Sequence, residues 1–259
     1  MVTVDGILGL ATFRRLGIEW SVGIALANLG EVTLRLGDAG GAVTLLEEAM
    51  TTFVHLGDGR LEVWCLNNLA HALHRVGDRA RSRSLLAEGL TRSVALYKEQ
   101  NLADALFAGG LMALDDGNHR EAELFLASAL QARVDYLGHE MVGTNLALLA
   151  EAAAESGDAT RAARLLGAAT AIVAETGDTL EPFFQTRYER TATAMRAAIG
   201  DSQFDAALDE GRSAADTVIN EAVAAATEDF QPLIDYVVAG PPARLRAGDQ
   251  QREVNVAPC

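Results

Sequence analysis

The stretch ALANLGEVTLRLGDAGGAVTLLEEA, residues 25–49, decides the fold of this chain because its pattern returns three more times at a spacing of 40 residues. Its repeating positions are Leu26, Leu29, Gly30, Gly37, Asp38, Ala42, Leu46 and Ala49. The second copy carries Leu66, Leu69, Ala70, Gly77, Asp78, Ser82, Leu86 and Gly89, the third Leu106, Gly109, Gly110, Gly117, Asn118, Ala122, Leu126 and Ala129, and the fourth Leu146, Leu149, Ala150, Gly157, Asp158, Ala162, Leu166 and Ala169. Four copies in register, without a gap, indicate an array of one supersecondary unit.

Large and small residues alternate inside each unit. Leu26 and Leu29 lie three positions apart, so they share one face of a helix, and Gly30 follows directly. A small residue at that point lets a neighbouring helix approach closely, and Leu46 in the second half of the unit is flanked by two alanines. The pattern therefore predicts two helices per unit that fit together as knob and notch.

A glycine followed by an aspartate or asparagine separates the two predicted helices. Glycine ends a helix in the left-handed conformation without a Cβ penalty, and the next side chain accepts a hydrogen bond from a free amide of the following helix. Similar glycines recur at the far end of the unit, at Gly57, Gly138 and Gly177. The turns are therefore short, and consecutive helices are antiparallel.

The repeated pattern resembles the tetratricopeptide repeat, with Leu26, Leu66, Leu106 and Leu146 at the position where that repeat usually carries tryptophan. The resemblance implies an all-α fold, a right-handed α-solenoid of antiparallel helix hairpins with about 10–12 helices. The period of 40 exceeds the usual length of about 34 residues, so each hairpin is longer. HEAT-type repeats have such periods and are the alternative, but they do not normally show the Gly-Asp punctuation.

A second resemblance covers roughly the last third of the chain. It rests on the segment RAARLLGAA at 161–169, on Tyr188-Glu189-Arg190, on Phe204 and Ala207, and on Glu210-Gly211-Arg212. These residues are similar to the C-terminal repeat region of large bacterial regulators of the actinobacterial type, in which a switch ATPase accompanies a LuxR-like DNA-binding domain or a cyclase. The resemblance implies a role in signalling or transcriptional regulation. The sequence itself contains no G-x-x-x-x-G-K-[S/T] loop for such an ATPase.

Composition narrows the classes of partner. The 259 residues are 49% hydrophobic but only 5% aromatic, so alanine and leucine dominate and a helical fold is favoured. A net charge of −15 disfavours binding to nucleic acid or an anionic membrane, both of which need a positive face. No apolar run approaches the ~20 residues that span a bilayer, so we expect a cytoplasmic protein.

Periodicity also divides the chain. Residues 1–16 resemble the second helix of a preceding repeat, hence a half-repeat or N-terminal cap, and residues 17–177 carry the four hairpins. In 178–239 the spacing slips, as expected of a divergent C-terminal hairpin with capping helices that meet water. Residues 240–259 lack apolar periodicity and are expected to be a disordered tail.

Candidates for catalysis or metal binding are few. His139-Glu140 resembles the start of a zinc-protease motif, but the second histidine is absent. His71 and His74 lie three apart on one predicted helix, yet no third ligand stands at a matching offset, which favours a solvated or groove-lining pair. Cys65 takes a position filled by small residues in the other copies, which indicates packing in a reducing compartment. We therefore predict no catalytic residue, no metal site and no cofactor.

The inner face of the array is the predicted binding surface. In tetratricopeptide arrays the first helix of each pair lines that face, which by register gives Ile24, Ala27, Glu31 and Arg35, then Trp64, Asn67, His71 and Arg75, then Asp104, Phe107, Leu111 and Asp115, then Thr144, Ala147, Glu151 and Glu155. The predicted partner-binding groove consists of Trp64, Asn67, His71, Phe107, Leu111, Arg35 and Arg75. Its arginines and the acidic pair Asp115 and Glu155 would form opposite ends that orient a bound segment. For Trp64 and Phe107, packing between helices as part of the core is an alternative of equal weight to lining the groove.

Three classes of function follow from this reading. The first is a non-enzymatic module that binds a protein or peptide segment, or senses a small effector. The second is a structural or oligomerisation scaffold with an empty groove, in which the array ends mediate homo-oligomers. An enzyme ranks last, because no acid, base and nucleophile share a plausible spacing.

Overall fold

The computed structural model describes residues 2–95, 99–134, 141–177, 180, 182–224 and 231–239, and within these it contains helices and no strand. The helices are α1 (Val2–Leu16), α2 (Glu19–Arg35), α3 (Ala39–Leu56), α4 (Gly59–Arg75), α5 (Arg79–Ala95), α6 (Glu99–Asp115), α7 (His119–Ala132), α8 (Val142–Glu155), α9 (Ala159–Thr176), α10 (Pro182–Ile199), α11 (Asp201–Ser213), α12 (Ala215–Val223) and α13 (Gln231–Ala239). The predicted all-α class is confirmed, with 13 helices in the described part rather than 10–12. The expected tail at 240–259 and the segment around His139 lie outside the described residues.

The Gly-Asp turns have the predicted geometry. Gly37, Gly77 and Gly157 have φ values of 94°, 90° and 88°, where a side chain would be strained. The aspartate that follows accepts an amide hydrogen bond of the next helix: Asp38 accepts from Gly41 N at 2.8 Å and Asp158 from Arg161 N at 3.1 Å. Each helix therefore ends and the next begins within three residues.

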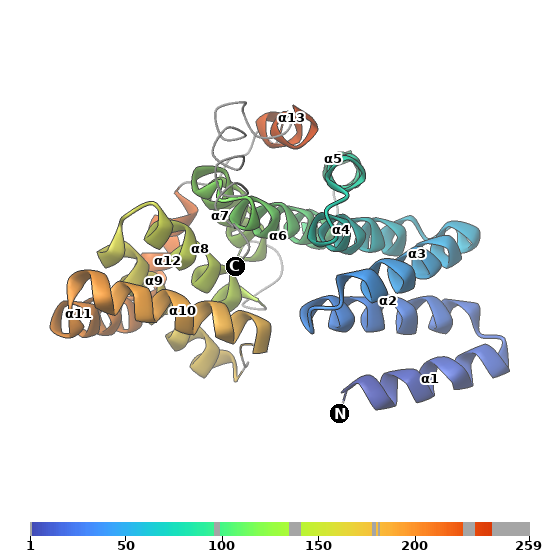
Figure 1. The fold of residues 1–259 in the computed structure, drawn as a ribbon, viewed down its shortest axis with the longest axis horizontal. Coiled ribbons are helices and arrows are strands. Elements are labelled where there is room, and N and C mark those ends of the chain that lie inside the picture. The colour runs from blue at the N-terminus through green and yellow to red at the C-terminus, as the bar shows by residue number, and fades with distance from the viewer. Residues whose placement is uncertain are drawn as a thin grey trace, which may run out of the picture.

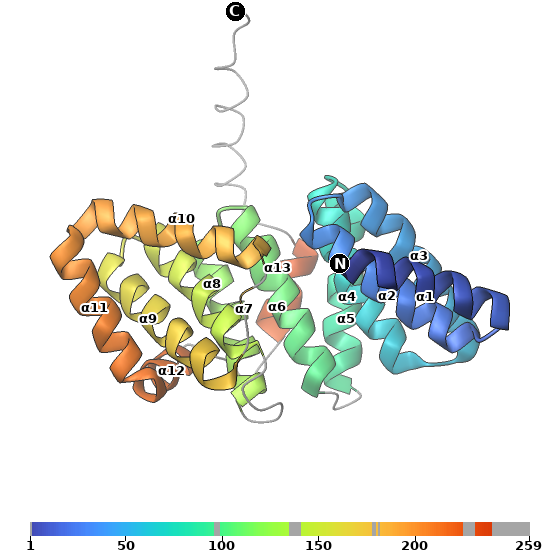
Figure 2. The ribbon, with the colours of Figure 1, turned by 90° about the horizontal axis from the view of Figure 1, so that it is seen from below.

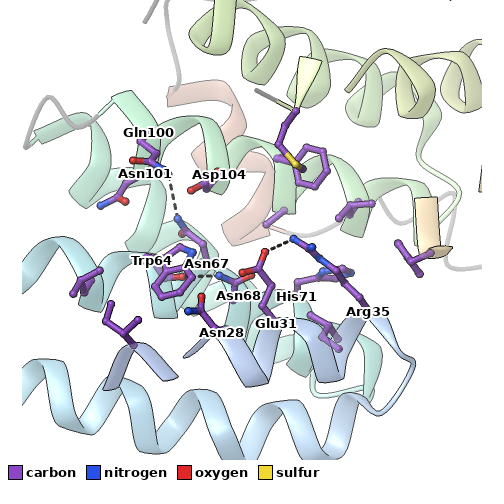
Figure 3. A pocket seen from close by; sticks show the side chains of 18 of the residues that line it. Asn28, Glu31, Arg35, Trp64, Asn67, Asn68, His71, Gln100, Asn101 and Asp104 are labelled. Carbon is purple, nitrogen blue, oxygen red and sulfur yellow. Dashed lines mark hydrogen bonds and ion pairs between the residues drawn. The ribbon is translucent and has the colours of Figure 1, made fainter. Parts of the chain in front are cut away.

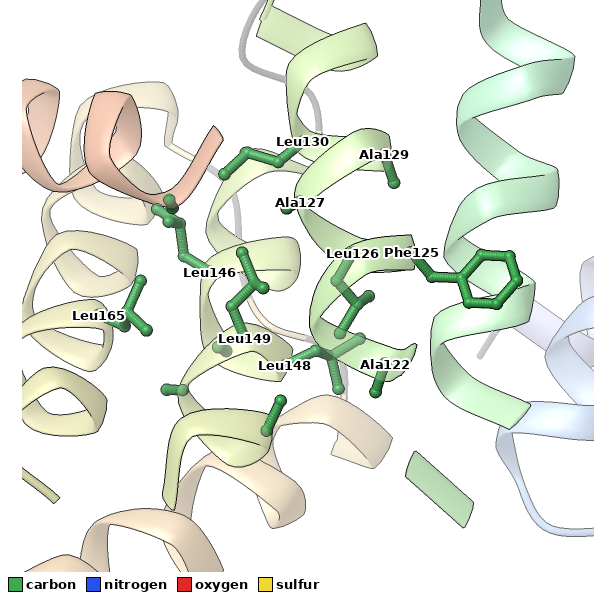
Figure 4. Close-up of a cluster of buried hydrophobic side chains, with 14 of the residues drawn as sticks. Ala122, Phe125, Leu126, Ala127, Ala129, Leu130, Leu146, Leu148, Leu149 and Leu165 are labelled. Atoms are coloured by element: carbon green, nitrogen blue, oxygen red, sulfur yellow. The ribbon is translucent and has the colours of Figure 1, made fainter. Parts of the chain in front are cut away.

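Knobs and notches meet inside the hairpins as the sequence predicts. A Cβ atom added to Gly30 would lie 2.7 Å from Leu46 Cγ, and one added to Gly110 would lie 2.6 Å from Leu126 Cγ. The glycines of the first helix thus receive the leucines of the second. The repeat leucines Leu26, Leu66, Leu106 and Leu146 are all buried. Figure 4 shows the next level of packing, between α7 and α8 of consecutive hairpins, where leucines of both helices are buried.

The helices succeed one another along the long axis of the molecule, with α1 towards one end and α11 at the other (Figures 1 and 2). Helices α2 to α9 form the four hairpins. No helix in the described ranges is both long and apolar enough to span a membrane.

The C-terminal helices return onto the array. Helix α10 contacts α8 and α9, α11 contacts α9, and α12 contacts α7 and α9. Helix α13 lies against α5, where Tyr236 packs its ring 6.2 Å from that of Phe125 on α7 (Figure 1). The contacts of α13 join parts of the chain more than 100 residues apart. The contacts of α10 to α13 account for the loss of the 40-residue period after Gly177, because these helices meet different surfaces.

Candidate functional site

One pocket of about 490 Å³ opens on the inner face, between α2, α4 and α6 (Figure 3). All seven predicted groove residues line it, namely Arg35, Trp64, Asn67, His71, Arg75, Phe107 and Leu111. The structure therefore brings these side chains together as the repeat register predicts. Their role in binding a partner stays a prediction.

Phe107 and Leu111 are not the exposed apolar centre that the sequence suggested. Leu111 is 3% exposed and Phe107 is 9% exposed. The ring of Phe107 packs edge-to-face on Phe184 at 5.8 Å, and the Arg133 guanidinium lies 5.6 Å from its centroid. Phe107 belongs mainly to the core because Phe184 of α10 packs on it, and Leu111 is buried in the same hydrophobic cluster. Trp64 remains partly exposed in the pocket.

Asn67 is committed to the scaffold. Its Nδ2 atom donates to the carbonyl oxygen of Asn101 at 3.1 Å, and Asn101 Nδ2 donates in turn to the carbonyl oxygen of Arg60 at 3.0 Å. The Asn67 Oδ1 atom lies where a Cβ atom of Gly89 would be. The Asn67 side chain thus links α4 to α6 through its Nδ2 atom.

His71 lines the pocket as a neutral side chain. Burial is the largest cause and lowers its pKa to about 4, while the charge of Asp115 raises the pKa and the charges of Arg75 and Arg187 lower it. His74 is buried and faces away from solvent, with Nε2 3.4 Å from Asp116 Oδ1. The expectation of a solvated pair is therefore wrong for His74. Among the described residues, no three His, Cys, Asp or Glu side chains are placed to hold a metal ion.

The predicted basic and acidic ends are not separate poles. Arg75 pairs with Asp115 at 3.9 Å, and Asp115 also accepts from Arg187 at 3.0 Å. Arg35 pairs with Glu31 one turn away on α2. Opposite charges on neighbouring helices meet because the hairpins stack closely, so this arrangement would not orient a segment by its two ends.

Helix α10 covers the inner face of the fourth hairpin. Glu151 is 5% exposed and forms ion pairs with Arg187 at 2.8 Å and with Arg190. Burial alone would lower the pKa of Arg187, but the charge and hydrogen bond of Glu151 outweigh that effect and raise it. The predicted lining residues Thr144 and Ala147 are buried as well. The inner face is open only over the first three hairpins.

Sequence reasoning missed the residues that close the pocket. Phe183 and Phe184, at the start of α10, reach across to the first hairpins. The Arg75 guanidinium lies 5.7 Å from the ring of Phe183, and that of Arg35 lies 6.0 Å from the ring of Phe184. Arg133, which pairs with Asp104 at 2.9 Å, forms part of the same wall. Phe183 and Phe184 stand after the repeat register is lost, so the only signal in the sequence was an adjacent aromatic pair.

Several further lining residues escaped the prediction from repeat register, and Trp20 and Arg60 are two of them. Both lie in the first turn of an inner helix, one repeat apart. Trp20 is 49% exposed, and its Nε1 atom is 3.4 Å from Asp58 Oδ2. The chain has two tryptophans, Trp20 and Trp64, and both line this pocket.

Cys65 is fully buried, and burial followed by the charge of Glu62 raises the pKa of its thiol to about 12. The thiol is therefore a packing group, as its register position predicted, and offers no nucleophile at neutral pH.

Comparison with known families supports the repeat assignment. Residues 21–93 match the family model described as tetratricopeptide repeat. The match spans α2 to α5, hence the first two of the four hairpins. Because α6 to α9 repeat the same register, the chain is a tetratricopeptide-like helical solenoid. No curated protein matches the chain. Tetratricopeptide repeats generally mediate binding between proteins.

Proposed function

We propose that this chain is a non-enzymatic interaction module that binds a segment of a partner protein at the inner face of α2, α4 and α6. One observation carries the proposal: a pocket of about 490 Å³ in the described structure lies on the face that tetratricopeptide arrays present to partners. Its rim consists of exposed polar side chains of three different hairpins, Asn28, Arg60 and Gln100, around a partly exposed Trp64.

The energetic core of such an interface is expected at Trp64. Tryptophan side chains combine a large apolar surface with one donor and are enriched among residues whose truncation costs most. Figure 3 shows Trp64 between Asn28 on α2 and Gln100 and Asn101 on α6. A segment that covers Trp64 would therefore reach donors and acceptors on both sides.

The wider role that we propose is in signalling or transcriptional regulation in a bacterium. It is supported by the likeness of RAARLLGAA at 161–169 and of Glu210-Gly211-Arg212 to the regulator repeat regions. These segments build the α9–α11 contact, so they concern the far end of the array. In this proposal the inner face receives the signal and the C-terminal helices pass it on.

Photo-crosslinking tests the proposal directly. Benzoylphenylalanine would be placed at Asn28 or Gln100, which line the pocket, and in separate variants at Val76 or Arg120, which are exposed elsewhere. We expect one partner band from the pocket positions that is missing from the control positions. Trp64→Ala should weaken its capture more than tenfold, the effect of losing a central tryptophan.

Equal capture from all four positions, or capture unaffected by Trp64→Ala in a folded variant, would reject the groove. Crosslinks obtained only from the ends of the array would instead favour a scaffold with an empty groove.

A further inference from the structure

We propose that the part of the pocket beside the first turns of α2 and α4 takes a small aromatic carboxylate, a compact ring that carries one negative charge. The inference rests on the proposed function of the inner face and names the ligand chemistry that this part of the face accepts. Three features of the pocket carry it: its closed end, its charge and its aromatic wall.

The pocket ends blindly. An extended peptide that followed the inner face past α6 would meet Phe183 and Phe184, and then the inner face of α8, where Glu151 is buried beneath α10. A channel for an extended chain therefore does not continue beyond the third hairpin. A volume of about 490 Å³ falls in the range of pockets that hold small molecules.

The pocket is positive in a strongly negative chain. Its lining holds four arginines but only two carboxylates, and it includes a histidine that burial keeps neutral at pH 7, whereas the chain carries a net charge of −15. Those side chains are Arg35, Arg60, Arg75, Arg133, Glu31 and Asp104. A small anion is the ligand that such a local excess of positive charge attracts.

Arg60 is the cation available to that anion. Arg35, Arg75 and Arg133 pair with Glu31, Asp115 and Asp104. The guanidinium of Arg60 has no ion-pair partner in the described part of the chain, and the residue is exposed at the rim. A single guanidinium matches one carboxylate by a paired hydrogen bond, whereas a polyphosphate would need several.

The wall beside Arg60 is aromatic. Arg60 and Trp64 lie four residues apart, hence on the same face of α4, and Trp20 belongs to the corresponding turn of α2. The partly exposed Ile24 adds apolar surface to the same lining. A flat ring would stack there while its carboxylate reached Arg60.

Three small-molecule probes distinguish the contribution of the aromatic ring to affinity from that of the negative charge. 3-Phenylpropionate has both, 3-phenylpropionamide keeps the ring without the charge, and 3-cyclohexylpropanoate keeps the charge without the aromatic ring. Binding would be measured by titration calorimetry and by tryptophan fluorescence, which reports on this pocket because both tryptophans line it. We expect 3-phenylpropionate to bind at least about tenfold more tightly than either analogue.

Arg60→Gln should reduce the preference for the acid over the amide to less than about threefold. Arg120→Gln, an exposed arginine outside the pocket, is the matched control and should leave that preference unchanged. Equal affinity for the three probes, no binding of any, or a preference that survives Arg60→Gln would overturn the inference.

The crosslinking experiment on the same preparation separates this inference from the proposed function. If the partner is still captured at Asn28 and Gln100 while the probes do not bind, only the ligand assignment fails. If neither the partner nor a probe binds, the inner face is not a binding site, and the proposed function fails as well.

Discussion

At the scale of single residues, the pocket contains side chains that look alike in the sequence and behave differently in the fold. Trp64 and Phe107 stand at neighbouring register positions of consecutive hairpins, yet Trp64 stays partly exposed and Phe107 is 9% exposed. The difference comes from Phe184, which packs on Phe107 from a helix 77 residues further along the chain. Repeat register identifies the residues that share a face. It does not show which of them a later segment covers.

His71 gives a prediction at this scale. Its pKa is lowered to about 4 in the fold, against 6.5 for an unperturbed histidine, so the unfolded chain takes up a proton first as the pH falls. The stabilisation that neutral His71 provides is present above pH 6.5 and is lost progressively towards pH 4. The cost to the free energy of unfolding at pH 4.5 is about 2 kcal/mol.

The measurement is urea unfolding at pH 7 and at pH 4.5. The loss of stability between the two pH values should be smaller in His71→Gln than in the wild type by about 2 kcal/mol. His55→Gln, which removes an exposed histidine, should behave as the wild type. An unchanged pH dependence in His71→Gln would show that this histidine is not buried in its neutral form.

At the scale of helices, the α9–α11 contact is the tightest that the structure shows. Gly167 and Gly211 bring the two backbones together: a Cβ atom at Gly211 would overlap the carbonyl oxygen of Arg164, and one at Gly167 that of Leu208. Backbone atoms cannot step aside as a flexible side chain can. We therefore expect Gly211→Ala to separate α11 from α9 and to cost about 3 kcal/mol, the upper range for overpacking.

Hydrogen exchange would localise that effect. Amides of α11 and of the adjoining α10 and α12 should lose protection in Gly211→Ala, while α2 to α5 keep theirs. Gly40→Ala is the matched control, because Gly40 lies in a helix with open space beyond its Cα atom, and it should leave stability unchanged or raise it slightly. Full protection of α11 in Gly211→Ala would contradict the close contact.

Helix α13 is held by a residue that departs from the repeat pattern. Asn118 stands where other copies carry a capping aspartate, yet it makes no cap hydrogen bond. Its Nδ2 atom donates instead to Tyr236 Oη at 2.7 Å. An aspartate at this position would accept from the tyrosine hydroxyl instead, with the direction of the bond reversed. The Asn118 side chain therefore joins the start of α7 to α13.

Tyr236→Phe and Asn118→Ala should each loosen α13. We expect a loss of about 1 kcal/mol in the local stability of α13, the typical worth of one hydrogen bond. Hydrogen exchange of residues 231–239 measures it, and the double variant should lose no more than the larger single loss, because both changes remove the same bond. Additive losses would mean that the two residues act separately.

At the scale of the whole molecule, the sequence predicts the structural features that recur in each repeat, but not the contacts that occur only once. The 40-residue period predicts the four hairpins, the left-handed glycines such as Gly37, and the notch that Gly30 offers to Leu46, since all of these are local or lie within one hairpin. It also predicts that the seven groove residues face one another. The period does not predict the contacts of the segments after Gly177, where the repeat is lost. These contacts are the closure of the pocket by Phe183 and Phe184, the cover over Glu151 and the docking of α13.

Among these non-repeating segments, the start of α10 closes one end of the inner-face pocket. Helix α10 closes the inner face at the third hairpin, while α12 and α13 lie against α9 and α5. The central claim is therefore that contact with a partner takes place on the inner face of the first three hairpins and not at the ends of the array.

Hydrogen exchange of the chain, free and bound to the partner that photo-crosslinking identifies, tests that claim most directly. We expect the backbone amides of α2, α4 and α6 to gain protection from exchange, most strongly around residues 60–68, with little change in α3, α5 and α11. Protection confined to α1 or to α11 and α12, with the inner helices unchanged, would contradict it and would identify the array ends as the functional surface.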